Sequence, residues 1–161
     1  QEGKLTIMCG GEKTAFKEVE EVMASYSQTC TLMGKIGSGQ LTKMANQICI
    51  AGILQGLSEA INFSQRAGID IDKMIEVISR GAAGSWQLEN RGKTMAANKF
   101  DFGFAVDWMR KDLDICLREA ESNGSPLPLV SLVDQFYKEV QLMGGGRWDT
   151  SSLIKRFENL N

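Results

Sequence analysis

The spacing of apolar residues divides the chain into a short α/β segment and a long helical region. Residues 4–10 form a nearly continuous apolar run, which is typical of a buried parallel strand. Apolar side chains then recur at intervals of three and four over residues 12–26, which predicts an amphipathic helix. A second apolar run, residues 29–33, ends at Gly34 and completes a predicted β-α-β unit.

This predicted unit is too small to be a complete α/β domain. Parallel sheets are normally covered by helices on both faces, and two strands with one helix leave one face open. We therefore expect residues 1–36 to be the end of a larger doubly wound domain whose beginning is missing. The chain starts with Gln1 and not with methionine, which agrees with this expectation.

From residue 37 onwards the pattern is helical. The apolar residues of the segment 39–67 lie almost all around a helical cylinder, so we expect other helices to bury it. The fold class predicted is therefore mainly α, with an all-helical domain over residues 37–161. Caps, prolines and glycines mark the further helices, at residues 70–79, 86–95, 107–121 and 129–143 and in a last short helix capped by Asp149 or Ser151.

Composition and charge exclude several classes of function. A formal net charge of −2, with basic and acidic residues interspersed, disfavours nucleic acid as a partner. The absence of histidine excludes Ser/His/Asp and Cys/His nucleophiles and the common zinc sites, and no metal site is predicted. No signal peptide or membrane span is expected, because the longest apolar run covers only residues 48–54. The four cysteines are expected to be buried free thiols of a cytoplasmic protein: Cys9, Cys30, Cys49 and Cys116.

The stretch with the clearest chemical pattern is the glycine turn at residues 37–39 and the helix start that follows it. Lys43, Asn46 and Gln47 lie three and four residues apart, so a cation and two amides share one helical surface. A desolvated lysine there would suit proton transfer near neutral pH. The alternative is an ordinary solvated helix start. The turn itself could bind an anion or simply allow tight packing, and it is not a G-x-G-x-x-G fingerprint because Thr42 occupies the third glycine position.

A lysine and the tryptophans have ordinary structural explanations. Lys111 lies near the start of the helix predicted at residues 107–121, where a charged and solvent-exposed turn is common. The tryptophans at positions 86, 108 and 148 are large packing groups, which we expect in a core or an interface.

Several sequence blocks, taken in order, resemble one family. LTIMCGG and GKIGSGQLTKMANQ are similar to the end of the Rossmann domain and to the catalytic-lysine motif of the β-hydroxyacid dehydrogenases, the group that includes 3-hydroxyisobutyrate dehydrogenase and tartronate semialdehyde reductase. AGSWQLENRG, FDFGFAVDWMRKDLDICL and SPLPLVSLVDQFY resemble three further blocks of that family. The resemblance covers almost the whole chain and implies its C-terminal part: the end of a Rossmann NAD(P)-binding domain at residues 1–36 and an all-α substrate and dimerisation domain at 37–161.

The resemblance implies roles for individual residues. Lys43 matches the lysine that exchanges a proton with the substrate oxygen while hydride passes to or from the nicotinamide. Asn46 and Gln47 match an amide pair that contacts the substrate, although many members have a second asparagine in place of Gln47. Ser85 and Trp86 resemble the segment that lines the substrate pocket.

On the cofactor side, the resemblance implies that Lys111 is the lysine of a KD motif near the bound NAD or NADP, and that Phe104 packs around the nicotinamide. The G-x-G-x-x-G segment that binds the pyrophosphate is absent, so we expect the chain by itself to be inactive and the missing Rossmann domain to be its partner. The expected parent is an oxidoreductase acting on a small β-hydroxy acid or its semialdehyde, as a homodimer or higher oligomer. The hydroxy acid and the choice between NAD and NADP stay open, and the alternative is a non-catalytic helical dimerisation or binding module.

Overall fold

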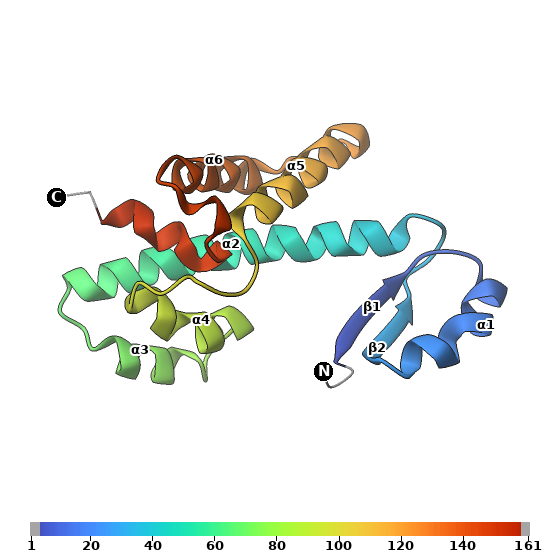
Figure 1. The fold of residues 1–161 in the computed structure, drawn as a ribbon, viewed down its shortest axis with the longest axis horizontal. Helices are drawn as coiled ribbons and strands as arrows, with labels where there is room; N and C mark the ends of the chain where they lie inside the picture. The colour runs from blue at the N-terminus through green and yellow to red at the C-terminus, as the bar shows by residue number, and fades with distance from the viewer. Residues whose placement is uncertain (1–3, 159–161) are drawn as a thin grey trace. The chain divides into compact units, whose positions relative to one another are not determined.

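The computed structural model describes residues 4–158, which form two compact units (Figure 1). The first unit extends to Asn46 and the second begins at Gln47, so the division falls inside one helix. The elements are β1 (Leu5–Cys9), α1 (Lys13–Ala24), β2 (Ser27–Leu32), α2 (Ser38–Arg66), α3 (Ile71–Ile78), α4 (Trp86–Ala96), α5 (Val106–Asn123), α6 (Pro128–Leu142) and the 3-10 helices η1 (Gly145–Arg147) and η2 (Thr150–Phe157).

The first unit contains the predicted β-α-β arrangement. Strands β1 and β2 pair in parallel, and α1 connects them. The Met23 sulfur of α1 lies 3.7 Å from the Cys9 sulfur and 3.8 Å from the Cys30 sulfur, so α1 packs against the sheet. The residues of β1 are exposed or half-buried, because in the described chain one helix covers only one face of the sheet, as expected for two strands and one helix.

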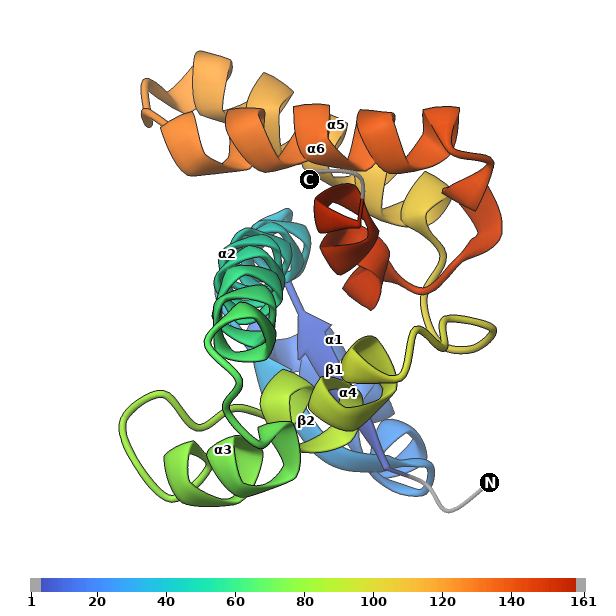
Figure 2. The same cartoon turned by 90° about the vertical axis from the view of Figure 1, so that its left-hand side faces the viewer.

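The second unit is built around α2. Helices α5 and α6 lie on one side of α2, and α3 and α4 lie on the other (Figure 2). The first side forms a core with α5 and α6 that includes Leu54, Leu113 and Tyr137. The second side forms a core with α3 and α4 that includes Ile61 and Leu88. These two cores confirm the mainly α fold class.

Some apolar positions remain exposed, contrary to the expectation from the sequence. On α2, Ile53 and Phe63 are exposed, so this chain alone does not bury the helix all around. Trp108 on α5 is also exposed, because it lies outside the stripe that packs on α2 and α6. The described cysteines are free, but only Cys116 is buried, and Cys49 is exposed on α2.

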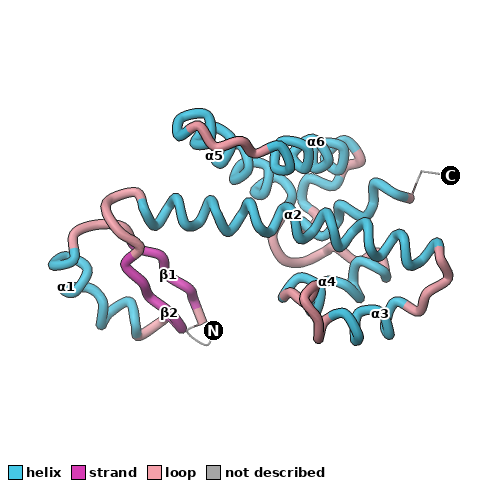
Figure 3. The backbone as a smooth tube through the Cα atoms, turned by 180° about the vertical axis from the view of Figure 1, so that it is seen from behind, coloured by secondary structure: helices cyan, strands magenta, loops and turns pink. Residues whose placement is uncertain are grey.

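The chain ends in short 3-10 helices and not in a regular α-helix. Gly144 adopts a left-handed conformation with φ of 85° and ends α6, after which η1 and η2 follow. Asp149 is the cap of η2, because its side chain accepts a hydrogen bond from the Ser151 N–H. Figure 3 shows in pink the irregular segment that connects α4 to α5, and this segment contacts the start of η2 through a bridge between Ala105 and Asp149.

Candidate functional site

The start of α2 lies directly against β1 because two glycines allow the backbones to meet. A Cβ atom at Gly39 would lie 2.3 Å from the Met8 carbonyl oxygen. A Cβ atom at Gly10 would lie 2.7 Å from the Lys35 carbonyl oxygen and 2.9 Å from the Ser38 nitrogen. Side chains at these positions would push the two segments apart, so the glycines set the path of α2 away from the sheet.

An open groove of about 660 Å³ lies in the first unit beside this junction. Lys43 and Asn46 line it from one face of α2, since residues three apart are neighbours on a helix. Lys43 is exposed and Asn46 is half-buried, so the lysine is in a solvated position of this chain. The remaining lining residues are Leu5, Thr6, Ile7, Met8 and Gly10 from the strand side and Gly39 and Gln40 from the helix.

Gln47, the next polar residue on α2, lies in the second unit and is turned into the protein. Its side chain is 3% exposed, and its amide nitrogen lies 2.9 Å from Oδ2 of Asp112 and 3.5 Å from the Met109 sulfur. The other carboxylate oxygen of Asp112 lies 2.8 Å from Nζ of the exposed Lys111. Gln47 therefore connects α2 to the predicted cofactor lysine on α5, and its contact with substrate stays a prediction.

The other predicted site residues lie at the start of α4 and in the segment between α4 and α5. Ser85 caps α4 by accepting a hydrogen bond from the Leu88 N–H at 3.1 Å. Trp86 follows it and is 59% exposed, so of the two expected places, a core or an interface, the core is wrong. Phe104 is also exposed, and its backbone N–H donates to Oδ2 of Asp149 at 2.9 Å.

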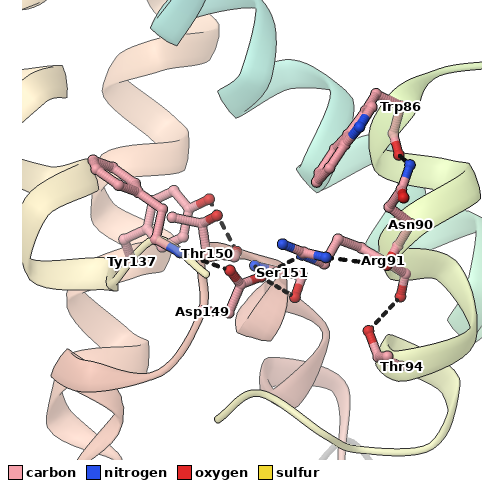
Figure 4. Close-up of polar contacts among 9 residues, drawn as sticks. Trp86, Asn90, Arg91, Thr94, Tyr137, Asp149, Thr150 and Ser151 are labelled. Carbon is pink, nitrogen blue, oxygen red and sulfur yellow. Dashed lines mark hydrogen bonds and ion pairs between the residues drawn. The ribbon is translucent and has the colours of Figure 1, made fainter. Parts of the chain in front are cut away.

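Sequence reasoning missed the residues that contact the Trp86 ring and the Phe104 backbone. Asp149 was recognised only as a possible helix cap, and Arg91 was not singled out. In the structure the Arg91 guanidinium carbon lies 4.9 Å from the centre of the Trp86 ring, and Arg91 pairs with Asp149 (Figure 4). A buried aspartate and an arginine far apart in sequence give no periodic signal, so only the fold brings them together.

Two further features bear on acid/base and metal chemistry in the described chain. Burial raises the pKa of Tyr137 well above its usual range, with the Asp149 charge acting in the same direction. This phenol therefore stays protonated and donates to the Thr150 carbonyl at 3.1 Å. Residues 4–158 contain no cluster of three or more acidic or cysteine side chains able to hold a metal ion. No helix in that range is long and apolar enough to cross a membrane.

Comparison with protein families gives matches for nearly the whole chain. Residues 37–157 match the family described as NAD-binding of NADP-dependent 3-hydroxyisobutyrate dehydrogenase. Residues 1–34 match the family described as the NAD binding domain of 6-phosphogluconate dehydrogenase. A nicotinamide cofactor is thus common to both matched families.

Individual relatives agree with the family match. An uncharacterised oxidoreductase of Shewanella frigidimarina is 60% identical over 98% of this chain and 54% of its own length. A probable 3-hydroxyisobutyrate dehydrogenase-like protein of Arabidopsis thaliana is 38% identical over 99% of this chain and 47% of its own. The chain therefore spans about half the length of these relatives.

A solved structure agrees with the fold as well. The crystal structure of 3-hydroxyisobutyrate dehydrogenase from Salmonella typhimurium superposes with a TM-score of 0.86 at 30% identity, covering 96% of this chain and 55% of the other. The match over residues 37–157 accounts for most of the chain. The chain belongs to the β-hydroxyacid dehydrogenase family that includes 3-hydroxyisobutyrate dehydrogenase, and it corresponds to the C-terminal part of that family's fold.

Proposed function

We propose that the chain is the C-terminal part of an NAD(P)-dependent oxidoreductase that transfers a hydride between the nicotinamide and a small β-hydroxy acid or its semialdehyde. The observation that carries the proposal is the groove of the first unit, where Lys43 and Asn46 face one space. A primary amine and a carboxamide on one surface can bind and protonate the oxygen of an alcohol or a carbonyl. Membership of the dehydrogenase family supports the same chemistry.

In the proposed mechanism Lys43 is the general acid and base. In the oxidation direction its neutral amine accepts the proton of the substrate hydroxyl, and in the reduction direction its ammonium donates a proton to the carbonyl oxygen. Asn46 lies one turn further along the same face, where its carboxamide can bind the substrate. The bound nicotinamide supplies or accepts the hydride, and the protein provides position and the proton.

The residues on the second unit fit the nicotinamide end of such a cofactor. Phe104 offers an exposed aromatic ring whose backbone is held in place, and Lys111 offers an exposed cation next to Asp112. An aromatic face and a cation suit a planar ring and an anionic phosphate. The G-x-G-x-x-G motif for the pyrophosphate does not occur in the chain, so we expect the chain alone to bind the cofactor weakly and to be inactive.

Substitution of Lys43 in the whole enzyme tests the acid/base role. We expect Lys43→Ala to lower kcat by a factor on the order of 10² to 10⁴ while the cofactor affinity stays nearly unchanged. Lys43→Arg should be almost as slow, because arginine keeps the charge but does not release its proton. Steady-state kinetics and cofactor titration measure both effects. Lys17→Ala, an exposed lysine of the same unit, is the control, and near-normal turnover of Lys43→Ala would refute the assignment.

The alternative is a non-catalytic dimerisation or binding module, for which the exposed apolar residues of α2 are the supporting observation. Cofactor titration of the whole protein, followed by turnover assays with a panel of C3 and C4 hydroxy acids, separates the two functions. Binding of NAD(P) with turnover supports the enzyme. Absence of NAD(P) binding, or binding without turnover across the panel, supports the module, and light scattering then measures whether it is a dimer.

A further inference from the structure

The carboxylate of Asp149 is buried, and both of its oxygens accept hydrogen bonds. Its side chain is 3% exposed. Oδ2 accepts a hydrogen bond from the Phe104 N–H at 2.9 Å, and Oδ1 accepts from the Ser151 N–H at 3.0 Å and from the Ser151 hydroxyl. Nε of Arg91 lies 3.4 Å from Oδ1 (Figure 4). A buried charge persists only when it is paired and hydrogen-bonded, and Asp149 meets both conditions.

The α4–α5 segment is shaped to reach this carboxylate. Gly103 has φ of 72°, and a Cβ atom there would lie 1.9 Å from Oδ2 of Asp149. Only glycine lets the following N–H, that of Phe104, approach so closely. Two backbone bonds reinforce the contact, since the Asp149 N–H donates to the Phe100 carbonyl and the Thr150 N–H donates to the Phe104 carbonyl, each at 2.9 Å.

Arg91, the second partner of Asp149, also contacts the Trp86 ring. The guanidinium carbon of Arg91 lies 4.9 Å from the centre of the Trp86 ring and 4.8 Å from the centre of the Phe102 ring. A planar cation at this distance attracts an aromatic face and stacks on it. Asp149 pairs with the same cation, since its Oδ1 lies 3.4 Å from Nε of Arg91. The exposed Trp86 ring is therefore held through Arg91 by a buried charge.

From this network we infer that Asp149 is a positioning residue of the active site, which holds Phe104 through its backbone and Trp86 through Arg91. The inference rests on the proposed function, together with the family resemblance, which implies that Phe104 packs around the nicotinamide and that Trp86 lines the substrate pocket. One carboxylate then positions Phe104 on the cofactor side and Trp86 on the substrate side of the site. Loss of its charge disturbs both sides, whereas a change at Arg91 disturbs mainly the substrate side.

Two substitutions in the whole enzyme test the inference. Asp149→Asn keeps the shape of the side chain but replaces one acceptor oxygen with an NH₂ donor. Either the Phe104 N–H or the pair formed by Ser151 and Arg91 then loses its acceptor. We expect kcat/KM to fall by roughly 10-fold to 100-fold, with increases in both the substrate KM and the cofactor Kd. Arg91→Lys keeps the charge beside Asp149 but not the planar stacking, so we expect the substrate KM to rise by about threefold with the cofactor Kd unchanged.

A readout that does not need turnover is the hydrogen exchange of the Phe104 amide. It should be faster in Asp149→Asn, because the acceptor at 2.9 Å is weakened, and unchanged in Arg91→Lys. Asp101→Asn and Arg80→Lys, exposed residues of the same types, serve as controls and should match the wild type in every measurement.

The outcomes separate this inference from the proposed function. An active wild-type enzyme whose Asp149→Asn variant keeps the wild-type KM, cofactor Kd and Phe104 exchange would overturn the role of Asp149 alone. A fall in kcat that only follows the folded fraction, with KM and Kd unchanged, would also overturn it, because Asp149 would then serve folding only. A wild-type enzyme without NAD(P)-dependent turnover over the whole panel would overturn the proposed function, and the site role of Asp149 with it.

Discussion

Gly39 lies where the backbone of α2 meets the backbone of β1, and it thereby determines where Lys43 stands. A Cβ atom at Gly39 would lie within 3.1 Å of both the Met8 carbonyl oxygen and the Cys9 carbonyl carbon. Both atoms belong to the backbone and cannot rotate aside. The helix start would have to shift, and Lys43 lies one turn further along the same helix.

We therefore expect Gly39→Ala to lower kcat of the whole enzyme by about tenfold or more, since a shift near 1 Å misaligns a proton donor. Overpacking should also destabilise the protein by about 1 to 3 kcal/mol. Kinetics and thermal unfolding measure the two effects. Gly56→Ala is the matched control on α2, because nothing lies within 4 Å of a Cβ atom there. Alanine should stabilise that turn by roughly 0.5 to 1 kcal/mol, and equal effects of the two substitutions would contradict the steric argument.

For single residues, helical spacing predicts which side chains share a face but not which ones are buried. The shared face of Lys43 and Asn46 follows from helical spacing, and the structure places both in one groove. The burial of Gln47 against Asp112 does not follow from spacing, because it depends on which helix packs there. Trp86 was expected in a core or an interface, and spacing could not decide between them; its exposure excludes the core. An apolar side chain predicts burial only where the fold supplies a neighbour.

At the scale of elements, the helices and strands were predicted well because their ends carry local signals. Asp70 and Ser85 cap α3 and α4, and Gly124 ends α5 in a left-handed conformation. These signals act within a few residues and need no tertiary contact. The 3-10 geometry of η2 was not predicted, because its residues also suit an α-helix and the buried contacts of Asp149 decide the local path.

The cap at Asp70 gives a pH-dependent prediction. Its side chain accepts a hydrogen bond from the Lys73 N–H at 3.1 Å, and this bond is the main reason that the pKa of Asp70 is lowered. Because the folded pKa lies below the unfolded one, the stabilisation is present above the unfolded pKa and is lost as the pH falls through the folded pKa.

Asp70→Ala should therefore lower the melting temperature at neutral pH, and the difference from the wild type should shrink as the pH falls towards about 2. Thermal unfolding followed by circular dichroism over that range measures the effect. Asp101→Ala, an exposed loop aspartate, should show little difference at any pH. A constant deficit of Asp70→Ala across the range would mean that the charged cap is not its cause.

At the scale of the whole molecule, the two units differ in how much apolar surface they bury. The second unit has two cores with fully buried side chains such as Leu113 and Tyr137. The described part of the first unit has no buried apolar side chain, and Leu5, Val19 and Val22 are exposed. The sequence indicated this imbalance, because two strands and one helix are fewer elements than a stable parallel sheet uses.

Hydrogen exchange of the chain by itself tests this difference in stability. Amides open at free energies that follow local burial, so we expect those of β1 and β2 to exchange at least about tenfold faster than those in the middle of α5 and α6. Tyr137→Phe sharpens the test, since it removes the bond to the Thr150 carbonyl at a cost of about 1 kcal/mol. It should speed exchange in α6 by about fivefold and leave β1 and β2 unchanged, because their opening exposes none of the core around Tyr137. Equal protection of the sheet and α6, or an equal response of both to Tyr137→Phe, would show that the chain unfolds as one cooperative body.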